Sequence, residues 1–236
     1  MTERRRIAII GDGRMGRAVA ALAAERGHAI VAMLGERENV GGVAIGSARL
    51  GNPDVAIEFT EPASALANVL ACVRERIPVV VGTTGWYAGL PEVERLVADA
   101  AGAVFYSPNF SFGVALFLRI AGEAARAFRD MAEYDAHIVE THHKAKKDAP
   151  SGTAASLAAV ASAGLGRAIG VTSVRVGSVP GTHELLFDAP FEQIRVAHEA
   201  RDRRVFAAGA VRAAEWLVGR QGVFTMQDML QLTLER

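Results

Sequence analysis

The sequence predicts an α/β protein in which a Rossmann-type domain with a parallel sheet is combined with an α+β domain that has an open, mixed sheet. Three observations lead to this prediction. Short apolar runs alternate with helical stretches through the first half of the chain, which is typical of βαβ units in a parallel sheet. A glycine-rich turn joins the first apolar run to the first helical stretch. Later runs alternate polar and apolar residues between turns, which indicates a half-exposed, mostly antiparallel sheet.

The first half contains five runs that are short and apolar enough to be buried strands. They cover residues 6–10, 29–34, 55–59, 78–82 and 103–107. Small and apolar residues at helical spacing predict the helices between these strands. The predicted helices cover residues 14–26, 62–75 and 91–101.

The second half has a different pattern. One long helix is expected over residues 113–133, a strand over 135–143 and a last helix over 205–218. A further helix is expected to begin near Ser151, because Pro150 disfavours helix at the residue before it and Ser-Gly-Thr is a good helix cap. Three strand-like runs lie before the last helix, with the sequences SVRVGSV, HELLFDA and FEQIRVAHEA.

Composition limits the class of protein. Of the 236 residues, 50% are hydrophobic and 22% are charged, which is ordinary for a globular protein. The formal net charge is zero, so no global attraction to nucleic acid or to a membrane surface is expected. The N-terminal apolar run is too short for a signal peptide, and no run is long enough to span a membrane. A single cysteine, Cys72, excludes an internal disulfide and a cysteine metal cluster, so we expect a cytoplasmic protein.

The turn after the first strand is rich in glycine. It has the sequence GDGRMG and comprises Gly11, Asp12, Gly13, Arg14, Met15 and Gly16. The first glycine permits a tight turn, the second lets a pyrophosphate approach the backbone, and the third lets the helix lie close to the strand. The N–H groups at the helix start would then bind phosphate. A glycine-rich turn without a ligand is the alternative.

Two further loops fit a dinucleotide. Glu36 and Arg37 follow the second strand, where a carboxylate binds the ribose hydroxyls of NAD and a guanidinium can hold the 2′-phosphate of NADP. Residues 82–84 (Gly82, Thr83 and Thr84) follow the fourth strand, at a sheet edge where open α/β sheets bind ligands. Solvated loop charges and a plain turn are the alternatives for these two loops.

The stretch ETHHKAKKDAPSGT, residues 140–153, concentrates the lysines of the chain. It holds two of the six histidines and all three lysines, which are Lys144, Lys146 and Lys147. Arginine cannot give up its proton in a protein, whereas lysine can shift its pKa and exchange one. We therefore expect at least one of these lysines to take part in chemistry, rather than all three forming a solvated basic turn.

The same stretch combines proton-exchanging and anion-binding groups. His142 and His143 are consecutive at a strand end, so their side chains point to opposite faces and are not expected to chelate one metal. Lys146 follows four residues after His142. Gly152 and Thr153 begin a helix whose positive end suits a carboxylate. This combination suits binding a carboxylate-bearing substrate and delivering a proton to it.

Two other polar clusters are less specific. The segment SPNFSFG closes the fifth strand, and its Asn109 can bind the nicotinamide carboxamide, reach the substrate, or only shape the turn. The segment HEARDR ends the last predicted strand of the second sheet. Its His198 and Arg203 either help to hold a substrate or are exposed strand-end charges.

Several segments match a known family. They run nearly from end to end and are GDGRMG, VAIEFTEP, VGTTGW, SPNFSFGV, VETHHKAKKDAPSGTA, HEARDRRVFAAGAVRAAEWL and GVFTMQDML. On these segments the chain resembles the bacterial dihydrodipicolinate reductase family, whose signature HHxxKxDAPSGTA is present in the fifth. The resemblance implies reduction of the cyclic dicarboxylate 4-hydroxy-tetrahydrodipicolinate with NADH or NADPH, in diaminopimelate and lysine biosynthesis. No metal is expected, because the cofactor carries the hydride chemistry.

The resemblance also implies roles for individual residues. His142 and Lys146 match the catalytic pair of the family. His143, Gly152 and Thr153 match its contacts to a substrate carboxylate. Besides GDGRMG, the matching cofactor positions are Glu36 and Arg37; Gly82, Thr83 and Thr84; and Ser107, Pro108, Asn109 and Phe110.

The domain plan of the family assigns residues 1–110 and 205–236 to a dinucleotide-binding domain and residues 111–204 to a substrate-binding domain that builds a homotetramer. The phosphate loop is one glycine shorter than the common family version, and the segment after Arg37 is short, so the choice between NADH and NADPH stays open. Another two-domain nicotinamide oxidoreductase, such as an amino-acid dehydrogenase, and a non-catalytic NAD(P)-binding sensor are the alternatives. A nucleic-acid binder is disfavoured by the zero net charge and the lack of an aromatic platform.

Overall fold

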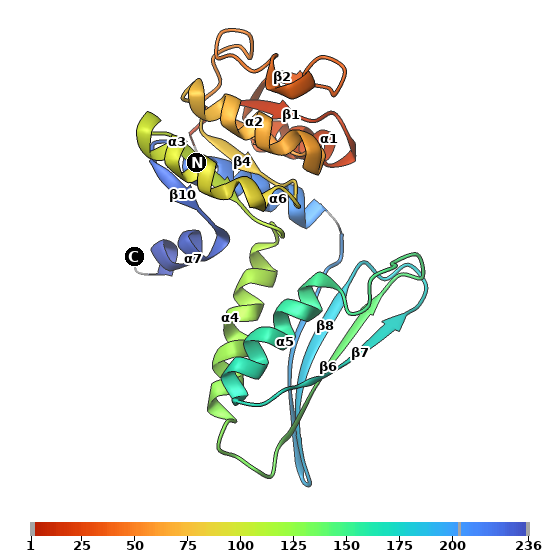
Figure 1. Cartoon of the computed structure of the whole chain (residues 1–236). Coiled ribbons are helices and arrows are strands. Elements are labelled where there is room, and N and C mark those ends of the chain that lie inside the picture. Colours follow the sequence, from red (N-terminus) through yellow and green to blue (C-terminus); the bar gives the residue numbers. More distant parts are fainter. Residues whose placement is uncertain (1–2, 203, 235–236) are drawn as a thin grey trace. The chain divides into compact units, whose positions relative to one another are not determined.

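The computed structural model describes residues 3–202 and 204–234 (Figure 1). These residues divide into two compact units, one within Met1–Ser111 and Arg204–Arg236 and the other within Phe112–Arg203. The first unit contains a parallel sheet and the second a mixed sheet, so the predicted fold class is confirmed.

A six-stranded parallel sheet forms the centre of the first unit. Its strands are β1 (Arg6–Ile10), β2 (Ala29–Leu34), β3 (Val55–Glu58), β4 (Val79–Val81), β5 (Ala103–Tyr106) and β10 (Gly222–Phe224). Their order is β10-β5-β4-β3-β1-β2, and each pair of neighbours is parallel. The strand order reverses between β1 and β3, which is the switch point where open α/β sheets bind ligands.

Helices cover both faces of this sheet. They are α1 (Arg14–Glu25), α2 (Pro62–Arg74), α3 (Leu90–Ala100) and α6 (Arg204–Leu217). Helix α1 packs with α6 on one face, and α2 packs with α3 on the other (Figure 1). Because both faces are covered, successive strand residues are apolar and fully buried, as in Ile7–Ile10 and Val79–Val81.

The second unit is a four-stranded sheet with two helices on one face. Its strands are β6 (Asp135–His142), β7 (Gly170–Arg175), β8 (Thr182–Ala189) and β9 (Glu192–Glu199). Their order is β7-β6-β8-β9, with β6 and β7 parallel and the other neighbours antiparallel. Helices α4 (Phe112–Ala127) and α5 (Gly152–Leu165) pack together on this sheet. The core between the layers includes Phe117, Leu157 and Phe187.

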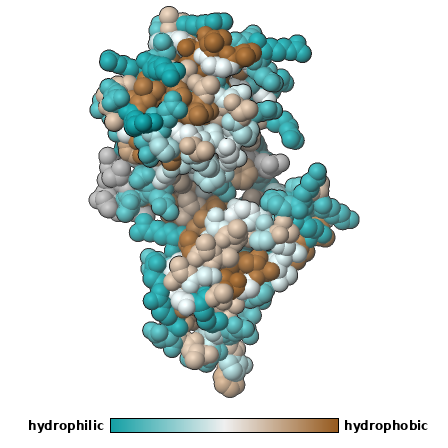
Figure 2. All heavy atoms as spheres, viewed as in Figure 1, coloured by the Kyte–Doolittle hydropathy of each residue, from teal (hydrophilic) through white to brown (hydrophobic). Residues whose placement is uncertain are grey.

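The exposed side of helix α5, which faces away from the sheet, is also apolar. Alanines occupy the exposed positions 155, 159 and 163, and Figure 2 shows a largely apolar surface over α4 and α5. Among the described residues, no helix combines the length and the hydropathy that a membrane span requires.

The predicted helix over residues 113–133 is too long, because α4 ends at Ala127. The residues that follow make contacts outside the helix. The ring of Phe128 stacks on Phe187 with 4.3 Å between centroids. Arg129 donates hydrogen bonds to the carbonyl oxygens of Ala163 (3.0 Å) and Gly164 (2.8 Å) near the end of α5. These contacts stabilise a turn where helical spacing alone predicts a continuing helix.

Two other parts of the chain differ from the prediction. The run predicted over SVRVGSV, residues 173–179, is displaced, because β7 covers Gly170–Arg175 and ends before a turn at Gly177 with a φ of 53°. Strand β10 and helix α7 (Met226–Leu234) were not predicted. Strand β10 is only three residues long and pairs along β5 at the edge of the sheet.

Candidate active site

Gly11 and Gly16 shape the loop between β1 and α1. Gly11 has a φ of 107°, and a Cβ atom there would lie 2.0 Å from the carbonyl oxygen of Phe59. A Cβ atom on Gly16 would lie 1.8 Å from the carbonyl oxygen of Gly11. Only glycine fits at these two positions. A Cβ atom on Gly13 would meet nothing within 4 Å, so the backbone there is open to a ligand.

An open pocket of about 370 Å³ lies beside this loop. Its lining comes from the segments after β1, β3 and β4, and consists of Gly13, Arg14 and Met15; Phe59, Thr60 and Pro62; and Gly82, Thr83 and Thr84. These three strands are neighbours at the switch point of the sheet. Residues 59–62 were not among the predicted site residues, although their position directly after a buried strand indicates a ligand-binding edge of the sheet.

Hydrogen bonds brace the loops that line the pocket. The backbone N–H of Thr60 donates to Thr83 Oγ1 (2.7 Å) and to Glu58 Oε1 (3.1 Å). Trp86 Nε1 donates to the carbonyl oxygen of Thr83 (2.9 Å). Glu58 is fully buried at the end of β3, and its Oε2 has no partner among the described residues. Burial raises the pKa of Glu58, although hydrogen bonds from Thr60, Thr83 and Asn68 oppose this shift.

The predicted ribose-binding residues lie at the same edge of the sheet. Glu36 and Arg37 are exposed in the turn that follows β2. The end of β2 lies against the glycine loop, because the N–H of Gly11 donates to the carbonyl oxygen of Leu34 (2.8 Å). Asp12 is also exposed. These three charged side chains lie near the pocket but do not line it.

The predicted loop at residues 107–110 follows β5. Ser107 Oγ donates to the carbonyl oxygen of Asn109 (2.7 Å), and Asn109 Oδ1 accepts a backbone N–H two residues further on (2.8 Å). Pro108 is exposed, whereas Phe110 is 2% exposed and packs near Phe59. These hydrogen bonds shape the turn, and the loop does not line the pocket described above.

In the second unit, polar side chains occupy one end of the buried sheet face. The strand register places four of them in one row, which consists of Ser173, Glu140, His183 and His198. The next row is apolar and consists of Val171, Ile138, Leu185 and Val196. Residues two apart on a strand share a face, so the polar row lies on the side covered by α4 and α5.

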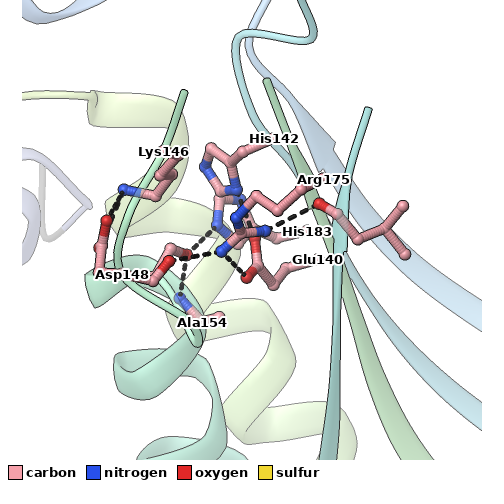
Figure 3. A network of polar contacts seen from close by, with 9 residues as sticks. Glu140, His142, Lys146, Asp148, Ala154, Arg175 and His183 are labelled. Carbon is pink, nitrogen blue, oxygen red and sulfur yellow. Dashed lines mark hydrogen bonds and ion pairs between the residues drawn. The ribbon is translucent and has the colours of Figure 1, made fainter. Parts of the chain in front are cut away.

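Both carboxylate oxygens of the buried Glu140 are paired (Figure 3). Oε2 forms a hydrogen bond with Nδ1 of His142, which lies two residues further along β6. Oε1 accepts a hydrogen bond from Nη2 of Arg175 (2.7 Å), and Arg175 lies opposite His142 on β7. The same Nη2 donates to the carbonyl oxygen of Asp148 (2.6 Å). One guanidinium therefore connects the strand to the loop that follows it.

His183 connects this network to the start of α5. Its ring lies against His142 in an edge-on arrangement, with 5.1 Å between the centroids. Its Nε2 shares a 3.0 Å hydrogen bond with Ser151 Oγ, which also accepts the N–H of Ala154 (3.2 Å) as the cap of α5. The helix start is therefore tied to the polar end of the sheet.

The predicted carboxylate-binding residues lie around this helix start. Gly152 and Thr153 are the first two residues of α5. A Cβ atom on Gly152 would meet nothing within 4 Å, so there is open space beside the helix end. His143 directly follows β6 and is half-buried.

Lys146 lies on the loop after β6, beside His142 in Figure 3. Its Nζ pairs with the carboxylate of Asp148 at 2.9 Å, and its side chain is 23% exposed. Lys144 and Lys147 are exposed. Lys146 is therefore the lysine of this stretch that the structure partly encloses and places next to His142.

The pKa values in the network follow from burial and from the arginine. Burial raises the pKa of Glu140, but hydrogen bonds from Arg175 and its neighbours lower it more, to about 2. Burial lowers the pKa of His142, and the opposing effect of Glu140 does not cancel this shift. Burial and the charge of His142 lower the pKa of His183 to about 4. At neutral pH, an ionised Glu140 is therefore paired with a neutral His142.

Two sequence models of one enzyme family match most of the chain. The model described as dihydrodipicolinate reductase, N-terminus, matches residues 5–110, and the model described as dihydrodipicolinate reductase, C-terminus, matches residues 113–230. The chain belongs to the dihydrodipicolinate reductase family. It is thus an NAD(P)H-dependent oxidoreductase with a nicotinamide-dinucleotide-binding fold.

Individual relatives agree with this family. The protein named 4-hydroxy-tetrahydrodipicolinate reductase from Christiangramia forsetii is 34% identical over 239 residues, which cover 95% of this chain and 97% of the relative. The protein of the same name from Methanoculleus marisnigri is 40% identical over 196 residues, which cover 76% of this chain and 77% of the relative.

A solved structure shares the fold. It is a dipicolinate-bound dihydrodipicolinate reductase from Paenisporosarcina sp. TG-14, with a TM-score of 0.78 and 21% identity. The match covers 94% of this chain and 98% of that chain.

This member of the dihydrodipicolinate reductase family contains three network residues that were not among the predicted site residues: Glu140, Arg175 and His183. Glu140 could have been predicted from the sequence, because a residue two positions before His142 on a strand lies on the same face of the sheet. Arg175 and His183 come from other strands, and only the register of the sheet aligns them with Glu140. His198 lies half-buried in the same polar row, and Arg203 lies outside the described residues.

Three residues of the network have the spacing of a metal site. Glu140, His142 and His183 bring possible ligand atoms within 4.8 Å of one another. The carboxylate oxygens are, however, already paired with Arg175 and His142. A guanidinium 2.7 Å from this carboxylate would repel a cation. The geometry of these residues therefore favours a hydrogen-bond network over a metal site.

Proposed function

We propose that this chain reduces 4-hydroxy-tetrahydrodipicolinate to tetrahydrodipicolinate with NADH or NADPH, a step of diaminopimelate and lysine biosynthesis. The observation that carries the proposal is the cluster of His142, Lys146 and the start of α5, because it combines proton donors with an anion-binding helix end. Relatives with this activity in their names support the substrate. An amino-acid dehydrogenase or a non-catalytic sensor has no comparable support, because the family match extends over both units.

The first unit fits a nicotinamide dinucleotide, which supplies the hydride when it is bound. The open space at Gly13 and the start of α1, which has no side-chain cap, suit the pyrophosphate. Glu36 would bind the ribose hydroxyls of NADH, and Arg37 would bind the 2′-phosphate of NADPH. Residues 82–84 and 107–110, which follow β4 and β5, would hold the nicotinamide end.

The second unit would bind the substrate. Gly152 and Thr153 would hold one carboxylate at the positive end of α5. His143, at the end of β6, would provide a further contact. The open space beside Gly152 supports this placement, because a carboxylate needs room next to the backbone N–H groups.

The same unit would supply the proton. The 4-hydroxyl group would leave the substrate as water, and the hydride would then add one hydrogen together with two electrons. The reduced ring needs one further proton, which His142 or Lys146 would give and regain from water. Lys146 would also neutralise the negative charge that develops on the substrate. Asp148 and Glu140 hold the two donors in place through hydrogen bonds.

We further propose that the chain forms a homotetramer in the cytoplasm. The sheet face opposite α4 and α5 carries apolar residues that no described element of this unit covers, among them Val139, Val174 and Leu186. Such a face is typical of an interface between copies. Light scattering of the purified chain distinguishes a tetramer from a dimer.

The test of the reaction is a coupled assay in which pyruvate and aspartate semialdehyde are condensed to the substrate. We expect the absorbance of NADH or NADPH to fall only when both precursors and this chain are present. Comparing the two cofactors gives the preference between them. The proposal would be refuted by a folded chain that oxidises neither NADH nor NADPH in this assay. It would also be refuted by a chain that instead oxidises amino acids with NAD⁺ or NADP⁺.

A further inference from the structure

Glu140 and Arg175 form a buried ion pair directly beside His142. The side chain of Glu140 is 0% exposed and that of Arg175 is 19% exposed, with 2.7 Å between Oε1 and Nη2. A buried ion pair generally contributes no more stability than well-packed apolar residues of the same size. The function of this pair is therefore to be found in its effect on the neighbouring histidine.

The charge of Glu140 fixes the direction of its hydrogen bond to His142. The guanidinium of Arg175 cannot lose its proton and lies on the carboxylate. With a pKa of about 2, Glu140 is ionised at neutral pH, and an ionised carboxylate can only accept hydrogen bonds. Nδ1 of His142 must therefore carry the proton of this bond. In neutral His142, the lone pair is then on Nε2.

Nε2 is the ring nitrogen of His142 that does not bond to Glu140. It forms no hydrogen bond with any residue that the structure describes. Gly181, with a φ of 154°, precedes β8 next to this nitrogen. A Cβ atom on Gly181 would lie 2.9 Å from Nε2. Glycine at this position therefore keeps a side chain away from Nε2.

We propose that Glu140, held by Arg175, is a positioning residue that fixes His142 in the Nδ1–H tautomer, so that Nε2 is the nitrogen that meets the substrate. The inference rests on the proposed function, because it concerns the proton exchange of that reaction. When Nε2 takes up a proton from water, the imidazolium keeps its Nδ1–H on Glu140. Transfer of the Nε2 proton to the reduced ring returns the same neutral tautomer.

Arg175 extends this positioning to the second proton donor. Its Nη2 donates to the carbonyl oxygen of Asp148 (2.6 Å) as well as to Glu140, and the carboxylate of Asp148 pairs with Lys146 (2.9 Å). A single guanidinium thus fixes both the histidine and the loop that carries the lysine.

Nitrogen-15 NMR of the histidine rings tests the tautomer in the chain without substrate or cofactor. At a pH where His142 is neutral, we expect a proton on Nδ1 and none on Nε2. In Glu140→Gln, the glutamine amide can donate to Nδ1, so the Nε2–H tautomer should appear. The pKa of His142 should also fall, because the carboxylate that raises it is gone while Lys146, Arg175 and His183 still face the ring.

Two further variants control for a general loss of structure. Glu184→Gln changes a carboxylate on the opposite face of the same sheet, where Glu184 is 26% exposed and lies 3.6 Å from Arg195, and it should leave the tautomer and the pKa of His142 unchanged. Glu140→Asp keeps the charge and should keep the pKa of His142 closer to that of the wild type. In the coupled assay, Glu140→Gln should lower kcat by about 10²-fold with little change in KM.

The outcomes separate this inference from the proposed function. A proton on Nε2 in the neutral wild-type histidine overturns the positioning role, even if Glu140→Gln fails to fold. An unchanged tautomer and pKa in a folded Glu140→Gln overturns it as well. If the expected tautomer is found but the coupled assay shows no imine reduction, the proposed function fails and the positioning of His142 stands.

Discussion

Each unit contains a fully buried glutamate, and the pKa values of the two carboxyl groups are shifted in opposite directions. Glu58 at the end of β3 and Glu140 in β6 are both 0% exposed. Glu58 accepts hydrogen bonds only from neutral groups, and burial raises its pKa. Glu140 lies 2.7 Å from the guanidinium of Arg175, and its pKa is lowered to about 2 despite its burial.

The two carboxylates have different partners, and this contributes to the difference between their pKa values. Neutral donors compensate only part of the cost of burying a charge, whereas a cation can compensate it fully. Glu58 therefore stabilises the pocket loops, because it accepts a hydrogen bond from the N–H of Thr60, which also donates to Thr83. Glu140 is an anion that Arg175 stabilises and that forms a hydrogen bond with His142.

The largest expected effect concerns the charged side of this comparison. Lys146→Ala should lower turnover by about 10²–10⁴-fold, because it removes a proposed proton donor and the charge proposed to neutralise the negative charge that develops on the substrate. The coupled assay measures this effect. Lys147→Ala, at an exposed position of the same loop, should keep turnover close to that of the wild type. Normal turnover in Lys146→Ala would show that this lysine is not catalytic.

Arg175→Met should make the environment of Glu140 resemble that of Glu58. The variant leaves a buried carboxylate without its cation, so the free energy of unfolding should fall by about 3–5 kcal/mol. Urea unfolding measures the change. Arg195→Met, which removes an exposed arginine 3.6 Å from Glu184, should cost less than about 1 kcal/mol. Equal losses in the two variants would mean that burial of the pair has no energetic importance.

The stability contribution of Glu140 should depend on pH. Its folded-state pKa of about 2 lies below the unfolded value of 4.5, so the ionised carboxylate stabilises the fold above pH 4.5 and loses this effect as the pH falls towards 2. The shift corresponds to about 3 kcal/mol. The difference in free energy of unfolding between the wild type and Glu140→Gln should therefore shrink over this range. A difference that is independent of pH would rule out the lowered pKa.

The smallest effect is expected for Glu58, with the opposite sign. Its folded-state pKa lies above the unfolded value of 4.5, so its contribution to stability is complete below pH 4.5 and is lost as the pH rises through the folded value. Glu58→Gln, which cannot ionise, should become more stable relative to the wild type as the pH rises. We expect about 1 kcal/mol or less. Urea unfolding at several pH values measures this difference in the free energy of unfolding. A Glu58→Gln variant that becomes less stable relative to the wild type as the pH rises would contradict the raised pKa.

The sequence predicts those features whose signals are local. Buried strands such as Ile7–Ile10 are apolar at every position, and the two proposed donors, His142 and Lys146, lie within one short motif. The end of α4 was misplaced because the turn that follows it is held by contacts between distant segments, such as the stacking of Phe128 on Phe187.

The partners of His142 show the same limit within the site. Glu140 is two residues away on the same strand, and strand geometry alone could have placed it beside the ring. Arg175 and His183 belong to strands whose pairing with β6 no local pattern specifies. The sequence therefore contained the proposed proton donors, but only the sheet register shows what positions them.

The most direct test of the central claim, that Arg175 makes Glu140 the anion that positions His142, is a carbon-13 NMR titration of the side-chain carboxyl groups. We expect Glu140 to titrate near pH 2 and Glu58 to titrate above 4.5, in the same sample. A Glu140 that titrates at or above 4.5 would contradict the claim, because Arg175 would then not stabilise the ionised form of this carboxyl group.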